Sequence, residues 1–269
     1  MSTVNLAEGR HLLFLDILGF SEITRNKSSA EILGVISKAF EEFDRWEELN
    51  GLFETIYFSD TFLFYQTSPG YHESCFLDIY AIGAFVHTAL LSEGIATRGA
   101  IAFGGFEVWD TDDGKHQAYF GTALVEAHEA ERKEGWIGIT ILPSAWEPFE
   151  AKEPGIVGCF ESEGVWIRRE DNVLLLNPFV KLRSWYIHDQ VEKIITPYLE
   201  WDAPEFPNEI RAFCFLKETA KTYAQAGDFT GKIASKYHNT MNFLRYVFGE
   251  ELYAWACKLA AESIDKLKQ

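Results

Sequence analysis

Two aspartates lie inside apolar, strand-like runs, and they are the side chains of this sequence that best fit metal chemistry. Asp16 lies in LLFLDILGF (residues 12–20), and Asp60 lies between the two β-rich halves of LFETIYFSDTFLFYQT (residues 52–67). Two carboxylates held close together repel each other unless a cation lies between them. Mg²⁺ and Mn²⁺ prefer a few carboxylate oxygens and complete their coordination shells with phosphate oxygens. The pair therefore predicts a divalent-metal site, to which the backbone carbonyl of Ile17 adds a ligand.

The residues that follow Asp16 favour phosphate binding. ILGF predicts a tight turn that leads into SEIT, where backbone N–H groups and a serine hydroxyl can hold phosphate oxygens. The predicted phosphate-binding residues are Leu18, Gly19, Phe20 and Ser21. A single aspartate at a strand end is more often a cap or a turn residue, so the hypothesis depends on the second aspartate.

The elements that must position this pair follow from the hydrophobic periodicity. A strand ends at Asp16, and a helix begins at Ser28 with the capping-box pattern of Ser28 and Glu31. We then expect a hairpin over 52–67, a helix over 73–93, two strands over 95–109, a helix over 121–135 and a strand over 136–142. This order predicts an α+β sandwich on a split βαβ core, with a mainly antiparallel sheet and helices on one face.

The second half of the chain has a different pattern. Residues 144–183 contain glycine-punctuated segments such as GIVGCF (155–160) and GVWIRRE (164–170), which predict further strands. From about residue 185 the pattern is helical. We therefore predict one domain over 1–183 and a helical C-terminal extension over 184–269, packed on that domain or on a partner subunit.

Composition limits the classes of partner. The 269 residues carry a formal net charge of −17 with an isoelectric point of about 4.8. Such a chain lacks the basic field that general binding to nucleic acid or to an anionic membrane requires. The four cysteines form no CxxC pair, and the first residues contain no signal-peptide pattern, so we expect a cytoplasmic protein.

With these motifs in view, residues 11–142 resemble the class III nucleotide cyclases. FLDILGF is similar to the first metal motif of that family, and FSDTFLF is similar to the second, with Ser59 where the family usually has glycine. TRGAIAFGG resembles the strand whose arginine binds triphosphate, which gives that role to Arg98. YFGTALVEAHEAE resembles the segment that enters the following helix at Gly121.

The resemblance implies an activity and a cofactor. In this family the acidic pair binds two Mg²⁺ or Mn²⁺ ions, and the 3′-hydroxyl of a nucleoside triphosphate attacks its own α-phosphate with loss of pyrophosphate. Active sites are shared between the two subunits of a homodimer, so a lone monomer is expected to be inactive. A late strand of the family adds a triphosphate-binding lysine, and in this chain Arg168 or Arg169 of VWIRRE lies at roughly that position. A pair of exposed arginines on a β-hairpin with no binding role explains the motif nearly as well.

Departures from the family concern the base and the transition state. Purine-specific members contact the base with polar residues where this chain has Ile56 and Ala118. The resemblance implies a base pocket formed by Ile56, Tyr57, Phe58 and Ala118. The expected asparagine and arginine of the transition-state helix fall at Val125 and Glu129. Two residues of the same helix are the candidates to replace them, His128 and Arg132.

These departures resemble the bacterial pyrimidine cyclases of the Pycsar antiphage systems, which are homodimers that make cyclic UMP or cyclic CMP for a separate effector protein. The resemblance implies a uridylate cyclase, with cytidylate as the second choice, because an uncharged pocket that contains a tyrosine can hydrogen-bond the uracil imide. Two alternatives stay open. One is an adenylate or guanylate cyclase, and the other is a non-catalytic cyclase-like module that binds nucleotide and transmits a signal.

Overall fold

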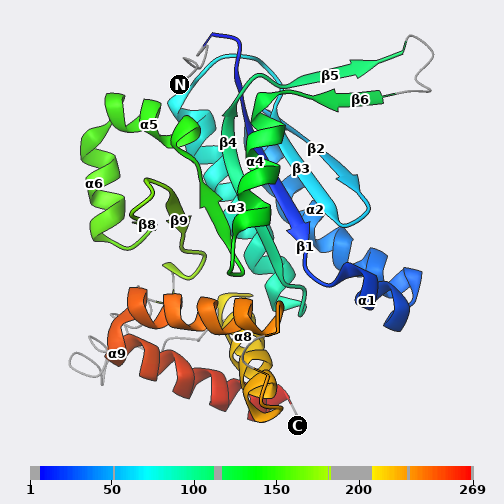
Figure 1. The fold of residues 1–269 in the computed structure, drawn as a ribbon, viewed down its shortest axis with the longest axis vertical. Coiled ribbons are helices and arrows are strands. Elements are labelled where there is room, and N and C mark those ends of the chain that lie inside the picture. The colour runs from blue at the N-terminus through cyan, green and yellow to red at the C-terminus, as the bar shows by residue number, and fades with distance from the viewer. Residues whose placement is uncertain are drawn as a thin grey trace.

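The computed structural model describes residues 7–50, 52–111, 117–180, 182, 208–228 and 231–267, without the side chains of 42, 45–50, 110 and 262–267. The predicted boundary between residues 183 and 184 lies outside the described residues, so it stays a prediction. Figure 1 shows a sheet with its covering helices in one part of the molecule and the C-terminal helices α8 and α9 below it in that view.

The main sheet has seven strands in the order β2-β3-β1-β4-β7-β9-β8. Its strands in chain order are β1 (Arg10–Ile17), β2 (Phe53–Phe58), β3 (Thr61–Gln66), β4 (Thr97–Gly104), β7 (Ile139–Ile141), β8 (Trp166–Arg168) and β9 (Leu174–Leu176). All neighbouring pairs are antiparallel except β4 and β7, which are parallel. Two further strands, β5 (Glu107–Asp110) and β6 (Gln117–Phe120), form a separate hairpin that projects beyond this sheet (Figure 1).

Helices cover both faces of the sheet. The described helices are α1 (Phe20–Asn26), α2 (Ser29–Asn50), α3 (Glu73–Ser92), α4 (Thr122–Lys133), α5 (Pro143–Lys152), α6 (Pro154–Ser162), α8 (Asn208–Gln225) and α9 (Ala234–Leu267). Because side chains alternate along a strand, the strands bury one set of residues on each face. Leu13 and Leu15 pack in the cluster that contains α3, whereas Leu12 and Phe14 pack with Ala123 and other residues of α4.

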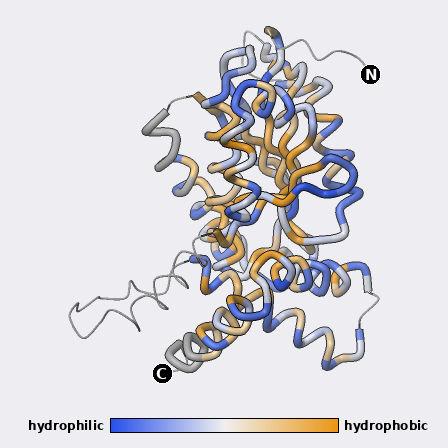
Figure 2. Tube along the Cα trace, turned by 90° about the vertical axis from the view of Figure 1, so that its left-hand side faces the viewer, coloured by the Kyte–Doolittle hydropathy of each residue, from blue (hydrophilic) through white to orange (hydrophobic). Residues whose placement is uncertain are grey.

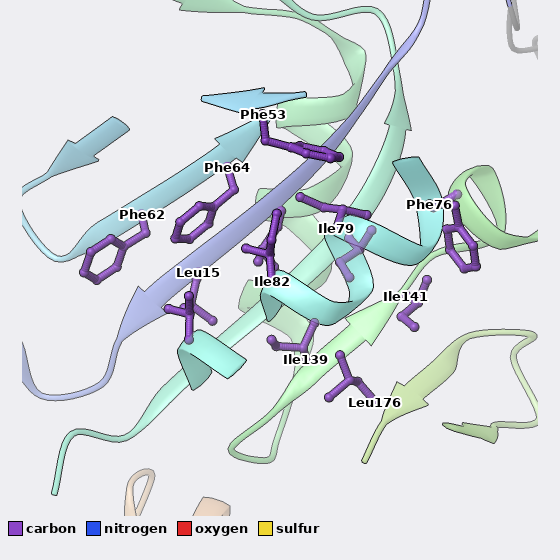
Figure 3. Close-up of a cluster of buried hydrophobic side chains, with 14 of the residues drawn as sticks. Leu15, Phe53, Phe62, Phe64, Phe76, Ile79, Ile82, Ile139, Ile141 and Leu176 are labelled. Carbon is purple, nitrogen blue, oxygen red and sulfur yellow. The ribbon is translucent and has the colours of Figure 1, made fainter. Parts of the chain in front are cut away.

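The larger of these two clusters is the main core of the sheet part. Aromatic side chains of β2 and β3 meet isoleucines of α3 and β7 there, as Figure 3 shows for Phe53, Phe62, Phe64, Ile79 and Ile139. Figure 2 shows the same arrangement as a hydrophobic centre in the sheet part of the trace. Among the described helices, α3 alone is long and apolar enough to cross a membrane by length and composition, and 61% of its apolar window is buried inside the protein, as in a core helix.

The C-terminal helices pack on the sheet part through α3. Helix α8 contacts α3 and α9. A separate apolar cluster joins Leu91 of α3 and Ile137, just before β7, to Phe213 of α8 and Leu244 of α9. Helix α9 bends at Gly249, whose φ of 71° is outside the helical region.

The fold class and the start of α2 agree with the prediction from sequence. The α+β class, the mainly antiparallel sheet, the helical C-terminal part and the capping box are confirmed: Ser28 N donates to Glu31 Oε2 at 2.7 Å, and Glu31 N donates to Ser28 Oγ at 3.3 Å. The expectation of helices on one face is incomplete, because α4 packs against the opposite face from α3.

The prediction of a strand at GIVGCF is wrong, because these residues form most of α6. Pro154 occupies the first turn of that helix, where a missing N–H is harmless. Ile156, Val157 and Phe160 then pack toward the core at helical spacing.

A close approach of two strands makes Gly99 of β4 sensitive to substitution. An ideal Cβ at this position would lie 2.3 Å from the carbonyl oxygen of Phe14. We expect Gly99→Ala to lower the free energy of unfolding by about 2 kcal/mol, because the backbone of β1 would have to move. Urea denaturation measures the change. Gly34→Ala in α2 is the matched control, because no atom lies within 4 Å of its ideal Cβ, and it is expected to be neutral or to stabilise the helix. Equal effects of the two substitutions would contradict this account.

Candidate active site

The two aspartates predicted from sequence come together at the end of β1. In the strand register Asp16 lies opposite Thr61 of β3 on one side and opposite Arg98 of β4 on the other. The N–H of Ile17 donates to the carbonyl of Asp60 at 2.8 Å, which ties the β2–β3 turn to the end of β1. Ser59, in the same turn, has a φ of 57°, a conformation that glycine adopts more readily, so the turn is tight at this point.

Arg98 lies between two carboxylates. Its Nη2 atom lies 3.8 Å from Asp16 Oδ2, and its Nε atom forms an ion pair with Glu131 Oε1 of α4. Glu131 is only 2% exposed. The sequence analysis missed Glu131, although the spacing of Ala123, Ala127 and Glu131 places all three on the buried stripe of α4.

The electrostatics of the cluster follow from this arrangement. Burial, helped by the negative charges of Glu131 and Asp60, raises the pKa of Asp16 to about 7, and Arg98 and Lys236 oppose the shift. Burial also raises the pKa of Glu131, against the effect of Arg98 and Lys236. The exposed Arg132 also favours the ionised form of Glu131, so three cations accompany the three carboxylates. Because the pKa of Asp16 is nevertheless raised, a further positive charge beside it would stabilise its ionised form.

The donor set fits a hard divalent cation. Asp16 and Asp60 supply carboxylate oxygens, and Ile17 supplies a carbonyl oxygen beside them. In the part of the chain that the structure describes, no group of three or more His, Cys, Asp or Glu side chains is arranged to hold a metal. A metal at this position would accordingly be held by these few oxygens and would complete its shell with water or phosphate oxygens, as Mg²⁺ and Mn²⁺ do.

The predicted phosphate-binding turn follows directly. Gly19, with φ 71°, precedes the first residue of α1, and its carbonyl accepts from the N–H groups of Glu22 and Ile23. Phe20 and Ser21 occupy the first turn of α1, where helix N–H groups have no partner within the helix. Leu18 is different, because its N–H already donates to the carbonyl of Ala96 at 2.9 Å.

The two late arginines predicted to bind triphosphate are both paired with carboxylates. Arg168 forms ion pairs with Glu150 and Glu161, both at 2.6 Å, and its guanidinium lies over the ring of Trp146. Arg169 donates from both terminal nitrogens to the carboxylate of Glu134 at 2.9 Å. Both guanidinium groups are therefore engaged by carboxylates, as that of Arg98 is, and their role in triphosphate binding stays a prediction.

The four residues predicted as a base pocket are divided among different surfaces. Ile56 packs on the α4 side of the sheet, whereas Tyr57 packs on the α3 side, with its ring 4.6 Å from that of Phe62. Phe58 is 76% exposed beside the β2–β3 turn. Ala118 lies on the projecting hairpin, opposite Trp109. Within one chain, then, Tyr57 does not share a pocket with Ile56.

The candidates on the predicted transition-state helix lie on the outer part of α4. His128 is exposed, and its ring centroid lies 5.3 Å from that of Phe14. Arg132, one turn later, is also exposed. Val125 and Glu129, the positions of the expected asparagine and arginine, are exposed as well.

Comparison with known proteins gives similarity to solved structures only. No family model matches the chain, and no curated protein matches it. Among solved structures, the monomeric guanylyl cyclase domain of the RhoGC fusion protein from the aquatic fungus Blastocladiella emersonii matches with a TM-score of 0.45 and 14% identity over 63% of this chain and 95% of that chain.

Two adenylyl cyclases are similar to a comparable degree. CyaB from P. aeruginosa has a TM-score of 0.44 and 13% identity over 54% of this chain and 81% of that chain. A bacterial light-regulated adenylyl cyclase has a TM-score of 0.44 and 14% identity over 70% of this chain and 98% of that chain. Similarity at this level does not transfer an activity, so the function proposed below depends on the residues of this chain.

The raised pKa of Asp16 predicts how the stability of the metal-free protein depends on pH. The ordinary pKa of an aspartate, 3.8, applies to the unfolded chain, and the folded value is about 7. The folded protein therefore ionises Asp16 less readily than the unfolded chain does. The resulting loss in the free energy of unfolding is absent below pH 4 and complete above pH 7. We expect Asp16→Asn to unfold with a free energy about 2 kcal/mol higher than the wild type at pH 8, with the difference disappearing near pH 4.

Denaturation in the presence of EDTA at several pH values measures this difference. Asp44→Asn is the control, because Asp44 is an exposed carboxylate on α2. Added Mn²⁺ is expected to raise the melting temperature of the wild type and to leave that of Asp16→Asn nearly unchanged. An Asp16→Asn protein that is less stable than the wild type at pH 8 would contradict the assignment.

Proposed function

We propose that this protein is a metal-dependent nucleotide cyclase that converts a nucleoside triphosphate to its 3′,5′-cyclic monophosphate and pyrophosphate. The observation that carries the proposal is the meeting of Asp16, Asp60 and Arg98 at the end of β1. Two carboxylates and one arginine on neighbouring strands supply oxygen donors for metal ions and a fixed cation for phosphate. The resemblance of the surrounding motifs to class III nucleotide cyclases supports the same conclusion.

The residues of this chain have distinct parts in that reaction. Asp16, Asp60 and the Ile17 carbonyl would hold two Mg²⁺ or Mn²⁺ ions, which lower the pKa of the attacking 3′-hydroxyl and neutralise the β- and γ-phosphates when bound. Arg98 would stabilise negative charge on the triphosphate. The N–H groups of Gly19, Phe20 and Ser21, in the turn that follows Ile17, would donate to phosphate oxygens.

The proposed substrate is a pyrimidine triphosphate, UTP before CTP. Support comes from the apolar Ile56 and Ala118 at the positions where purine-specific cyclases have polar base readers. The packing of Tyr57 on the α3 side weakens the argument for uracil over cytosine within one chain. An adenylate or guanylate cyclase that reads its base through main-chain groups fits the site equally well.

A homodimer with shared active sites is part of the proposal. Asp16 lies at the end of β1, whereas the hairpin that carries Ala118 follows Gly104, which is paired with Arg10 at the start of β1. In the proposed dimer the hairpin of a second copy would therefore lie at the metal site. Large apolar side chains are exposed on the hairpin and on the helix that follows it: Val108, Trp109, Phe120 and Val125. Phe58 is exposed at the other end of the sheet, beside the β2–β3 turn. An exposed apolar group of this kind is typical of a protein interface.

The biological role is proposed from the sequence resemblance alone. By that resemblance the cyclic nucleotide is a second messenger in antiphage defence, made in the cytoplasm and bound by a separate effector protein.

The non-catalytic alternative has one specific observation in its favour. Val125 and Glu129, at the positions of the transition-state donors, cannot supply the hydrogen bonds of an asparagine and an arginine.

An assay with each of the four nucleoside triphosphates and Mn²⁺ tests the activity. We expect pyrophosphate release and a cyclic product with UTP or CTP, reduced more than about 100-fold by Asp16→Ala or Asp60→Ala because the metal oxygens are removed. Asp44→Ala, on the exposed surface of α2, is the carboxylate control and should retain full activity. Turnover that survives both site substitutions would overturn the proposed site, and metal-dependent binding without turnover would favour the non-catalytic module.

Self-association is tested through Trp109. Trp109 and Phe120 lie on the same face of the β5–β6 hairpin, because their positions alternate with Val108 and Tyr119 in the strand pairing. We expect Trp109→Asp to shift the protein from dimer to monomer in sedimentation velocity and to abolish turnover. Leu33→Asp on α2 changes an equally exposed apolar residue elsewhere and should leave the dimer intact. A Trp109→Asp protein that stays dimeric would exclude the hairpin as the interface.

A further inference from the structure

A lysine from the C-terminal helices reaches the end of α4, beneath the candidate site. Lys236, in the first turn of α9, is 5% exposed. Its Nζ atom donates to the carbonyl of Glu134 at 3.0 Å, across 102 positions of sequence. Glu134 is in turn tied to α4, since its N–H donates to the carbonyl of Glu131 at 3.1 Å.

Neighbours of Lys236 hold the same loop without adding charge. Thr240 Oγ1 accepts from the N–H of Ile137 at 2.8 Å, and Asn239 Nδ2 donates to the carbonyl of Gly135 at 2.7 Å. These bonds fix the segment between α4 and β7 to α9. The hydrogen bonds of Thr240 and Asn239 therefore hold the loop without the ammonium group of Lys236. Because burying a cation is costly, its presence here indicates a role other than holding the loop.

From its position at the end of α4, Lys236 also interacts electrostatically with the buried carboxylate of Glu131. The positive charge of Lys236 lowers the pKa of Glu131, and the negative charge of Glu131 raises the pKa of Lys236. Burial and the nearby Arg98 act in the opposite direction, and they bring the pKa of Lys236 to about 8. At neutral pH the lysine is still mostly protonated, so Glu131 has two cations on the protein side, Arg98 in direct contact and Lys236 at longer range, and a third, Arg132, that is exposed to solvent.

Two cations at one buried carboxylate have a consequence for Arg98. In the ligand-free chain Arg98 is paired with Glu131 and Asp16, whereas the proposed function needs it on the triphosphate. Leaving Glu131 buried without a cation would be strongly unfavourable. A second cation that stays in place removes most of that penalty.

We propose that Lys236 is a positioning residue of the triphosphate site: it remains as the counter-ion of Glu131 when Arg98 moves from that carboxylate to the phosphates of the substrate. This inference rests on the proposed function. It makes the C-terminal helices part of the nucleotide site, although none of their residues is assigned to the chemistry.

The test uses the full-length chain and a charge-removing substitution that keeps a hydrogen-bond donor. Lys236→Gln is expected to raise the KM for the preferred triphosphate, and its Kd in Mn²⁺ measured by calorimetry, about tenfold, with kcat changed less than twofold. Lys236→Arg restores the charge and should restore both values to within about twofold. Thr240→Val, which removes a loop contact without changing charge, should leave KM and Kd unchanged.

A double-substitution cycle shows whether Lys236 acts through Glu131. With Glu131→Gln the carboxylate no longer needs a counter-ion, so adding Lys236→Gln should then change Kd less than twofold. If Lys236→Gln changes Kd by the same factor with and without Glu131→Gln, Lys236 does not act through Glu131 and the inference is overturned. If Thr240→Val raises Kd as much as Lys236→Gln does, the role of Lys236 is structural and the inference is also overturned. Circular dichroism checks the fold of each variant, and Lys236→Met is the second charge-free variant if Lys236→Gln does not fold.

The two proposals fail in different ways. A wild-type protein that binds a triphosphate with Mn²⁺ but converts none of the four nucleoside triphosphates would overturn the cyclase function. The Kd values of the double-substitution cycle would still decide the role of Lys236. A wild-type protein that binds none of the four triphosphates would overturn both proposals.

Discussion

The structure depends on one buried ion pair, between Arg98 of β4 and Glu131 of α4. This pair connects the α4 face of the sheet to the strand ends, and the same guanidinium lies beside Asp16 of β1. Asp16, Asp60 and Glu131 are accompanied by Arg98, Lys236 and the exposed Arg132. A divalent ion beside Asp16 and Asp60 would add positive charge at the end of β1, which is how a chain with a net charge of −17 can be proposed to bind an anionic substrate.

The apolar scaffold makes this arrangement rigid. Both faces of β1 are covered, by α3 on one side and by α4 on the other, so its backbone cannot shift to relieve the repulsion at its end. The close approach of Gly99 to Phe14 fixes β4 against β1, and that contact sets the distance between Arg98 and Asp16. Packing therefore holds charged groups in positions that they would not adopt on the surface.

The C-terminal helices belong to the same physical unit in the described part of the chain. Helix α8 packs on α3, and α9 holds the loop between α4 and β7 through Thr240, Asn239 and Lys236. These hydrogen bonds connect α9 to the segment that directly follows the helix carrying Glu131.

The sequence by itself determined the local elements and the acidic pair. Periodicity and turn residues predicted the strand before Asp16, the hairpin at Asp60 and the capping box at Ser28, because each of these depends on neighbours a few positions away. Only the tertiary structure decided which side chains meet Arg98. Glu131 lies 33 positions after Arg98 and Lys236 lies 138 positions after it, and no local pattern pairs charges over such separations. That Ile56 and Tyr57 face opposite sides of the sheet follows from their adjacent positions in β2, so it could have been predicted from the sequence. The physical reason is that a buried charge is fixed by the partners that folding brings to it, whereas the periodicity of a segment is fixed by its own residues.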